Sequence, residues 1–107
     1  MNAGNEFVEP WASVGRYAQN LEDELKREVT DSHVLWGCKA KAIAQRIDTD
    51  DVLFEVDCGE GSYAVVYLTW KGRPEMGHRW PVVRLFKSFE AWVEECMLKD
   101  HAEYMRE

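Results

Sequence analysis

The chain has few cysteines, and no two of them lie close together in the sequence. Cys38, Cys58 and Cys96 form no CxxC pair, so the sequence predicts neither a zinc knuckle nor a redox motif. An odd number of scattered cysteines is typical of reduced thiols in the cytoplasm. We therefore expect all three thiols to be reduced and partly buried.

Long apolar runs and an excess of positive charge are missing as well. No stretch approaches the length of a membrane span, and residues 1–9 lack the basic segment and apolar run of a signal peptide. The 13 Lys and Arg residues are outnumbered by 20 Asp and Glu residues, which gives a net charge of −7. Nucleic acids and anionic membranes select positive surfaces, so we expect neither as a partner and expect a cytoplasmic location.

No motif for catalysis, metal binding or cofactor binding stands out. His33, His78 and His101 are isolated, without the spacing of a metal-binding pair. Residues 48–51 lack the glycine and final glutamate of a calcium loop, and residues 59–61 lack the continuation of a phosphate-binding loop, so both are predicted to be turns. We expect no cofactor and no metal, and an enzyme stays an unsupported alternative.

What is present suffices for one folded domain. A length of 107 residues allows one hydrophobic core, and 46% apolar with 31% charged residues is a globular composition. Five tryptophans in a chain of this size indicate a well-filled core, an adhesive surface, or both. We expect a single domain over residues 1–107, with residues 1–9 and 101–107 loosely ordered.

The hydrophobic pattern predicts a helix near each end. From Pro10 onward, apolar residues recur at steps of three and four, most regularly over residues 17–28. This first stripe contains Trp11, Val14, Ala18, Leu21 and Leu25. Ser88 has the residue type of an N-cap and precedes a second stripe that predicts a helix to about Leu98. The second stripe contains Phe89, Trp92, Val93 and Cys96.

Four strands are predicted between the helices, over residues 40–45, 52–57, 63–70 and 82–86. Residues 63–70 are apolar on both faces, which indicates a central strand covered on both sides. In the first two strands the pattern alternates. Ala40, Ala42 and Ala44 share one face of the first strand, and in the second Val52, Phe54 and Val56 face the core while Leu53, Glu55 and Asp57 face outward. The predicted fold is α+β, an antiparallel β-meander of about four strands with an N-terminal and a C-terminal helix, in the order α-β-β-β-β-α.

The negative charge is concentrated in the two predicted helices. Residues 18–31 carry a net charge of −3 and residues 88–107 a net charge of −4, whereas residues 71–87 carry +4. The acidic helices are therefore one candidate contact surface, represented by Glu22, Glu24, Glu94 and Glu95. The alternative is ordinary solvation, because helix faces commonly carry charge for solubility.

A second candidate contact surface is the loop from Lys71 to Pro81. It is longer than most hairpin connections, and Arg, Trp and Met are residue types that serve well at protein interfaces. With the residue before the loop, its candidate binding residues are Trp70, Arg73, Met76, His78, Arg79 and Trp80. The alternative is that Trp80 packs onto Trp70, since burial of a large aromatic side chain stabilises a fold by about 2–3 kcal/mol.

Three short segments resemble a family of small bacterial proteins of unknown function. They are DDVLF at residues 50–54, YAVVYLTW at residues 63–70 and the pattern FxSFxxW at residues 86–92. The likeness takes in His33 and Gly37 and covers most of the chain from residue 20 onward. It implies no catalytic residue. Where the family pattern has histidine in VVHLTW, this chain has Tyr67, and the loss of that histidine favours a structural or binding role.

Together these features predict a small bacterial protein that binds another protein, with a basic partner favoured. One concrete version is an immunity protein that neutralises a basic toxin such as a secreted nuclease. The alternative is an enzyme or small-molecule binder with a pocket between sheet and helices, for which the candidate residues are Tyr67, Trp70, His78 and Cys58. Either is compatible with a homodimer through a sheet edge or the Trp80 loop.

Overall fold

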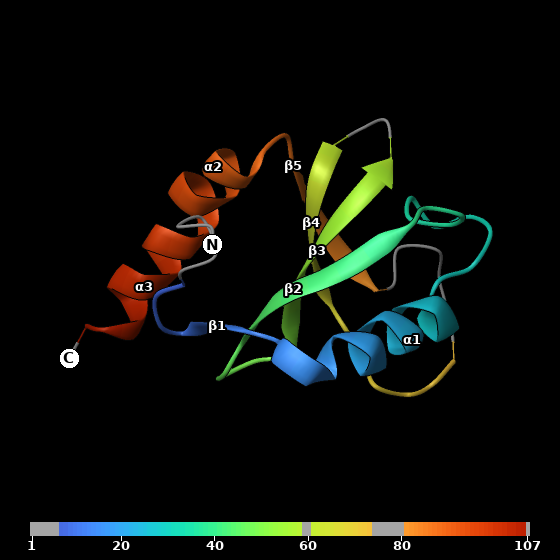
Figure 1. The fold of residues 1–107 in the computed structure, drawn as a ribbon, viewed down its shortest axis with the longest axis horizontal. Helices are drawn as coiled ribbons and strands as arrows, with labels where there is room; N and C mark the ends of the chain where they lie inside the picture. Colours follow the sequence, from blue (N-terminus) through green and yellow to red (C-terminus); the bar gives the residue numbers. More distant parts are fainter. Residues whose placement is uncertain (1–6, 59–60, 74–80, 107) are drawn as a thin grey trace.

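A computed structural model describes residues 7–58, 61–73 and 81–106, and shows a fold built on one five-stranded sheet (Figure 1). The strands lie in sequence order and every neighbouring pair is antiparallel. They are β1 (Trp11–Ser13), β2 (Ala40–Arg46), β3 (Asp51–Cys58), β4 (Gly61–Tyr67) and β5 (Val82–Phe86). The α+β class and the predicted meander are confirmed, with one strand more than expected.

Helical segments flank the sheet at both ends of the chain. α1 (Ala18–Glu28) follows a 3-10 turn at Gly15–Tyr17. The C-terminal helix, residues 89–104, runs through α2 (Phe89–Trp92), a π-helical turn (Val93–Met97) and α3 (Leu98–Tyr104). The Ser88 hydroxyl accepts the Ala91 N–H at 3.0 Å, so the predicted N-cap is confirmed. The helix continues beyond the expected end near Leu98.

The prediction of helix from Pro10 onward is wrong for residues 11–14. Trp11 pairs with Arg46 in the sheet, and the Val14 N–H donates to the Ile43 carbonyl at 3.2 Å. Gly15 follows at φ 56°, a left-handed conformation that favours glycine and separates the strand from the helix. The order of elements is therefore β-α-β-β-β-β-α.

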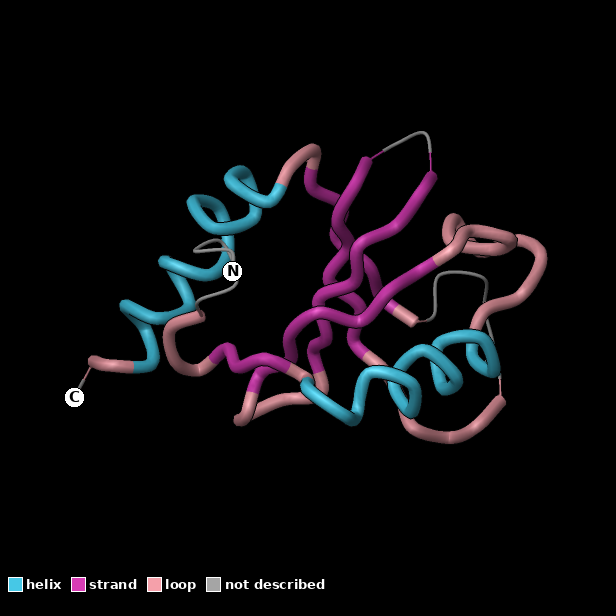
Figure 2. Tube along the Cα trace, in the orientation of Figure 1, coloured by secondary structure: helices cyan, strands magenta, loops and turns pink. Residues whose placement is uncertain are grey.

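Each face of the sheet carries its own hydrophobic core. On one face α1 packs Leu21 and Leu25 against Phe54, and on the other the C-terminal helix packs Trp92 against Leu53. The two helices accordingly lie on opposite sides of the sheet (Figures 1 and 2). β4 contributes buried side chains to both cores, as predicted for residues 63–70.

The predicted facing of β2 and β3 needs correction at two residues. A β-bulge between Ala42 and Ala44 shifts the register with β3, so Ala42 lies in the α1 core and Ala44 in the opposite core. Leu53 is fully buried rather than outward, because the C-terminal helix covers that face of the sheet. Glu55 is exposed as predicted.

Candidate functional site

The C-terminal helix presents an exposed face that combines carboxylates with apolar side chains. Apart from the adjacent pair Glu94 and Glu95, its members follow one another at steps of three or four residues, which places them along one side of the helix. We call this set the outer helix face: Glu90, Glu94, Glu95, Leu98, Ala102 and Met105. Leu98 and Met105 are 48% and 57% exposed. Over the described ranges, none of the three glutamate side chains forms a hydrogen bond or ion pair.

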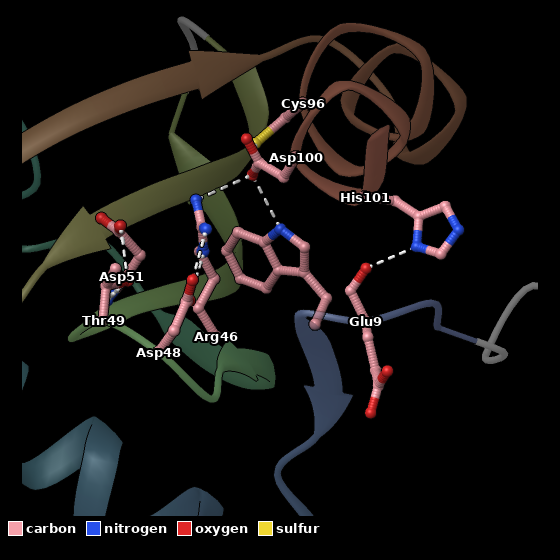
Figure 3. Close-up of polar contacts among 9 residues, drawn as sticks. Glu9, Arg46, Asp48, Thr49, Asp51, Cys96, Asp100 and His101 are labelled. Carbon is pink, nitrogen blue, oxygen red and sulfur yellow. Dashed lines mark hydrogen bonds and ion pairs between the residues drawn. The ribbon is translucent and has the colours of Figure 1, made fainter. Parts of the chain in front are cut away.

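The inner side of the same helix is fixed to the sheet by Asp100 (Figure 3). Its Oδ2 atom accepts a hydrogen bond from Trp11 Nε1 at 2.9 Å and lies 3.4 Å from Arg46 Nη1. Next to it, His101 Nδ1 donates to the Glu9 carbonyl at 2.6 Å. These contacts of Asp100 join the helix to β1 and β2, so the helix that carries the outer helix face is held in place on the sheet.

The acidic turn at residues 48–51 is held by its own side chains (Figure 3). Arg46 donates to both carboxylate oxygens of Asp48, at 2.9 and 2.8 Å, and these bonds hold the pKa of Asp48 below its usual value. Thr49 Oγ1 donates to Asp51 Oδ2 at 2.8 Å. The predicted turn is confirmed, and internal bonding accounts for Asp48 and Asp51.

Glu22 and Glu24, the other two predicted contact glutamates, are bonded within the protein. Glu22 Oε2 accepts the Ala42 N–H at the β-bulge, at 2.9 Å. Glu24 is only 2% exposed, and its Oε2 accepts the Gly72 N–H at 3.0 Å. The expectation that Glu24 offers a surface charge is wrong, because its carboxylate accepts a hydrogen bond from a backbone N–H that has no partner in the sheet. Both residues also lie across the sheet from Glu94.

Glu28, which the sequence pattern does not single out, forms a buried carboxyl pair with Glu24. Its two oxygens accept the N–H groups of Thr69 and Trp70 at 2.9 and 2.8 Å. Burial raises the pKa of Glu28 to about 7, and the hydrogen bond to Glu24 contributes to the rise. Burial also acts to raise the pKa of Glu24, but its hydrogen bonds hold that pKa below the usual value. The pair fixes the chain where the predicted contact loop begins.

Of the predicted loop, the structure describes the two ends. Trp70 is 47% exposed and has φ 61°, a left-handed conformation that is uncommon outside glycine, and Arg73 is exposed. The contact residues Met76, His78, Arg79 and Trp80 lie outside the described residues. Their contact role, and the packing of Trp80 onto Trp70, stay predictions.

His33 is a structural histidine that holds the far end of this loop. It is buried, and its Nδ1 accepts the Leu35 N–H at 3.1 Å. The other ring nitrogen, Nε2, therefore carries the proton and donates to the Pro81 carbonyl at 2.7 Å. The sequence contains no sign of this role, because the partner carbonyl is 48 residues away.

The expectation of three reduced cysteines is wrong for Cys38, which is disulfide-bonded. Disulfide formation at Cys38 depends on which chain segments the fold brings together, and the spacing of the cysteines in the sequence does not reveal this. Cys96 is a buried free thiol whose pKa is raised to about 12 by burial and by the charge of Asp100, as expected for inert packing. The Cys58 side chain lies outside the described part of the structure.

A groove of about 650 Å³ lies between the sheet and the start of the C-terminal helix, and we call it the sheet groove. Strand register places Lys41 of β2, Glu55 of β3 and Tyr63 of β4 side by side along it. Phe89 and Glu90 of α2 form the facing wall. Burial raises the pKa of Tyr63, and the charges of Glu55 and Glu90 raise it further.

The residues predicted for an enzyme or small-molecule pocket do not come together here. Tyr67 and Trp70 are exposed and neither lines the sheet groove, while His78 and the Cys58 side chain lie outside the described residues. Within residues 7–58, 61–73 and 81–106, no three His, Cys, Asp or Glu side chains are grouped to hold a metal ion. No helix in those same ranges is long and apolar enough to cross a membrane.

A smaller apolar cleft of about 400 Å³ separates α1 from the segment before β2. Leu25, Val29 and Leu35 line it, and Trp36, 55% exposed, stands at its edge. No hydrophobic pattern in the sequence predicts this cleft, because its shape depends on how the segment after α1 turns back beside the helix. Comparison of the chain with models of protein families, with curated proteins and with solved structures found no match.

Proposed function

We propose that this chain is a protein-binding module whose contact surface is the outer helix face. The observation that supports the proposal is the group of three carboxylates that are unpaired among the described residues, on a helix face that continues to exposed Leu98 and Met105. Glu90 and Glu94 are like charges four residues apart, an arrangement that costs helix stability in the free protein. A bound cationic partner would remove that cost, whereas a face selected for solubility alone would more often pair its charges.

The partner that fits this surface is a basic protein with exposed apolar residues. Opposite charge accelerates association and fixes orientation, and flexible apolar side chains such as Met105 adapt to the shape of the partner. The net charge of −7 argues against nucleic acid and anionic membranes as partners. A homodimer through the same face is disfavoured because it would bring the three glutamates of each copy together.

One concrete version is a bacterial immunity protein that neutralises a basic secreted toxin such as a nuclease. Its support is the small size, the acidic helix and the lack of a recognisable catalytic motif. A gene for a secreted basic toxin beside this one would strengthen that version. Such a protein acts in the reducing cytoplasm of the producing cell, and the disulfide bond at Cys38 stands against that location.

Selection of random peptides displayed on phage tests the proposal while the partner is unidentified. The wild type is compared with a double variant, Glu94→Gln with Glu95→Gln, and with a charge-matched control, Asp31→Asn with Asp50→Asn. Both control positions are exposed and carry no side-chain hydrogen bond or ion pair in the described ranges. We expect peptides rich in Arg, Lys and apolar residues, enriched on the wild type and control but not on the double variant. Enrichment without excess positive charge contradicts the proposal.

A second candidate function is a small-molecule binder or enzyme that uses the sheet groove. The observation in its favour is a groove of about 650 Å³ lined by Lys41, Glu55 and Tyr63. The pKa of Tyr63, raised by burial and by neighbouring carboxylates, is the kind of perturbation found at functional sites. A screen of uncharged metabolites by nuclear magnetic resonance (NMR) distinguishes this function from protein binding. The second function requires that one such metabolite binds saturably at the groove.

A further inference from the structure

The sheet groove has aromatic walls that suit a cationic group. The ring centroids of Phe7 and Phe89 are 6.2 Å apart and those of Tyr63 and Phe89 are 5.8 Å apart, and all three residues line the groove. Both pairs meet edge to face, with interplanar angles of 72° and 64°, so the three rings do not stack flat on one another. The faces of aromatic rings attract cations, especially where water is partly excluded.

Two carboxylates stand beside these rings, and in the described part of the chain neither forms an ion pair. Glu55 is the register partner of Tyr63 on β4, and Glu90 belongs to α2. Burial raises the pKa of the Tyr63 hydroxyl, and the charges of both carboxylates raise it further. Lys41 lies opposite Glu55 in register, but among the described side chains no ion pair joins the two. The groove thus has two carboxylates against one ammonium.

The Tyr63 hydroxyl is also open to a ligand. Tyr63 is half-buried, and in the described part of the chain its hydroxyl has no hydrogen-bond partner. A phenol oxygen can accept an N–H as well as donate its proton. A cation in the groove would therefore meet ring faces, carboxylate oxygens and one further acceptor.

We infer that the sheet groove binds the guanidinium group of an arginine side chain on the basic partner. A guanidinium is planar and weakly hydrated, so it can stack on Phe89 or Tyr63 while its five N–H donors reach both carboxylates and the phenol. The more strongly hydrated ammonium of lysine makes no such planar contact. Glu90 belongs to both the groove and the outer helix face, which makes the arginine a continuation of that surface. The source of the arginine rests on the proposed function, whereas the chemistry of the groove does not.

The test uses a free probe rather than the unidentified partner. N-acetyl-arginine methylamide is titrated into isotope-labelled protein, and the ring resonances of Tyr63 and Phe89 are followed by NMR. The citrulline analogue, uncharged and nearly the same shape, is the comparison ligand. We expect saturable shifts of both rings with the arginine probe and binding at least about fivefold weaker with the citrulline probe, because the cation–π and carboxylate contacts are lost.

Two exposed positions provide variants that retain the fold. Glu55→Gln and Glu90→Gln are each expected to weaken arginine binding about threefold or more, with an unchanged melting temperature. Glu103→Gln, an exposed carboxylate that does not line the groove, is the matched control and should bind as the wild type does. Tyr63→Phe should keep the fold and lose part of the affinity, since only the hydroxyl is removed.

Equal binding of the arginine and citrulline probes overturns the inference, and so does the absence of shifts at Tyr63 and Phe89. Unchanged arginine affinity in both glutamine variants overturns it as well. The proposed function is tested separately, by Glu94→Gln with Glu95→Gln and displayed peptides, because neither of these two residues lines the groove. Failure of the groove and failure of the proposed function are therefore distinguishable.

Discussion

At the scale of single residues, the acidic side chains of this protein divide into two kinds. Glu22, Glu24 and Glu28 accept backbone N–H groups from the β-bulge and from residues 69–72, and so act as structural acceptors. Glu94 and Glu95 have no such partner in the described ranges. Residue type identifies both kinds as acidic, but it does not show which carboxylates are structural. That depends on backbone N–H groups without a strand partner, which belong to segments distant in the sequence.

The carboxyl pair makes stability depend on pH near neutrality. The pKa of Glu28 is about 7 in the folded chain against a usual value of 4.5, so between these values only the folded state keeps the proton. The free energy of unfolding should therefore fall as the pH rises from about 5 to about 7, and level off above that range. Urea unfolding at several pH values measures this, with Glu28→Gln as the comparison.

The variant isolates the contribution of this one group. Glu28→Gln cannot titrate, so its stability should lack the decline that wild type shows between pH 5 and 7. A constant stability difference between the two proteins across this range would show that Glu28 does not carry the predicted proton.

The redox state of Cys38 in the cell distinguishes a reducing compartment from an oxidising one. Because Cys38 is disulfide-bonded, we expect it to resist alkylation in protein taken directly from its own cells until a reductant is added. Peptide mapping by mass spectrometry measures the labelled fraction at each cysteine. Full labelling of Cys38 without reductant would contradict the disulfide and agree with the reducing cytoplasm that the sequence predicts.

At the scale of secondary structure elements, the sequence predicts well whatever depends on local pattern. The two-sided strand predicted at residues 63–70, the helix predicted over residues 17–28 and the Ser88 cap follow from side-chain period and residue type. All three are found, although the strand runs from Gly61 to Tyr67 and the α-helix from Ala18 to Glu28. β1 is missed because a three-residue edge strand takes its pairing from β2, whereas its apolar residues happen to continue the helical period of α1. The facing of Ala44 is missed because a bulge breaks the alternation.

The position of the C-terminal helix on the sheet depends on Asp100. Asp100→Ala removes the acceptor of Trp11 Nε1 and a partner of Arg46, and should lower the free energy of unfolding by about 2 kcal/mol. Glu103→Ala, on the exposed side of the same helix, is the control and should change it by less than about 0.5 kcal/mol. Chemical unfolding followed by tryptophan fluorescence measures both, and equal effects would refute the anchoring role.

At the scale of the whole molecule, the acidic side chains on the two sides of the sheet are in different environments. α1 uses its acids to hold the bulge and the loop, while the C-terminal helix on the opposite side leaves its acids exposed beside Leu98 and Met105. The net charge read from the sequence could not show this asymmetry, since it follows from which N–H groups lack a strand partner. The candidate contact surface is consequently one helix, and not the two that charge alone predicts.

The affinity of an enriched cationic peptide for two charge-matched variants tests the central claim most directly. Isothermal titration calorimetry would compare wild type with the double variant Glu94→Gln, Glu95→Gln and with the control Asp31→Asn, Asp50→Asn. We predict a loss of about tenfold or more for the first and less than about twofold for the second, because only the first removes charge at the contact. Equal losses would show that net charge alone attracts the peptide and would contradict a contact surface on the outer helix face.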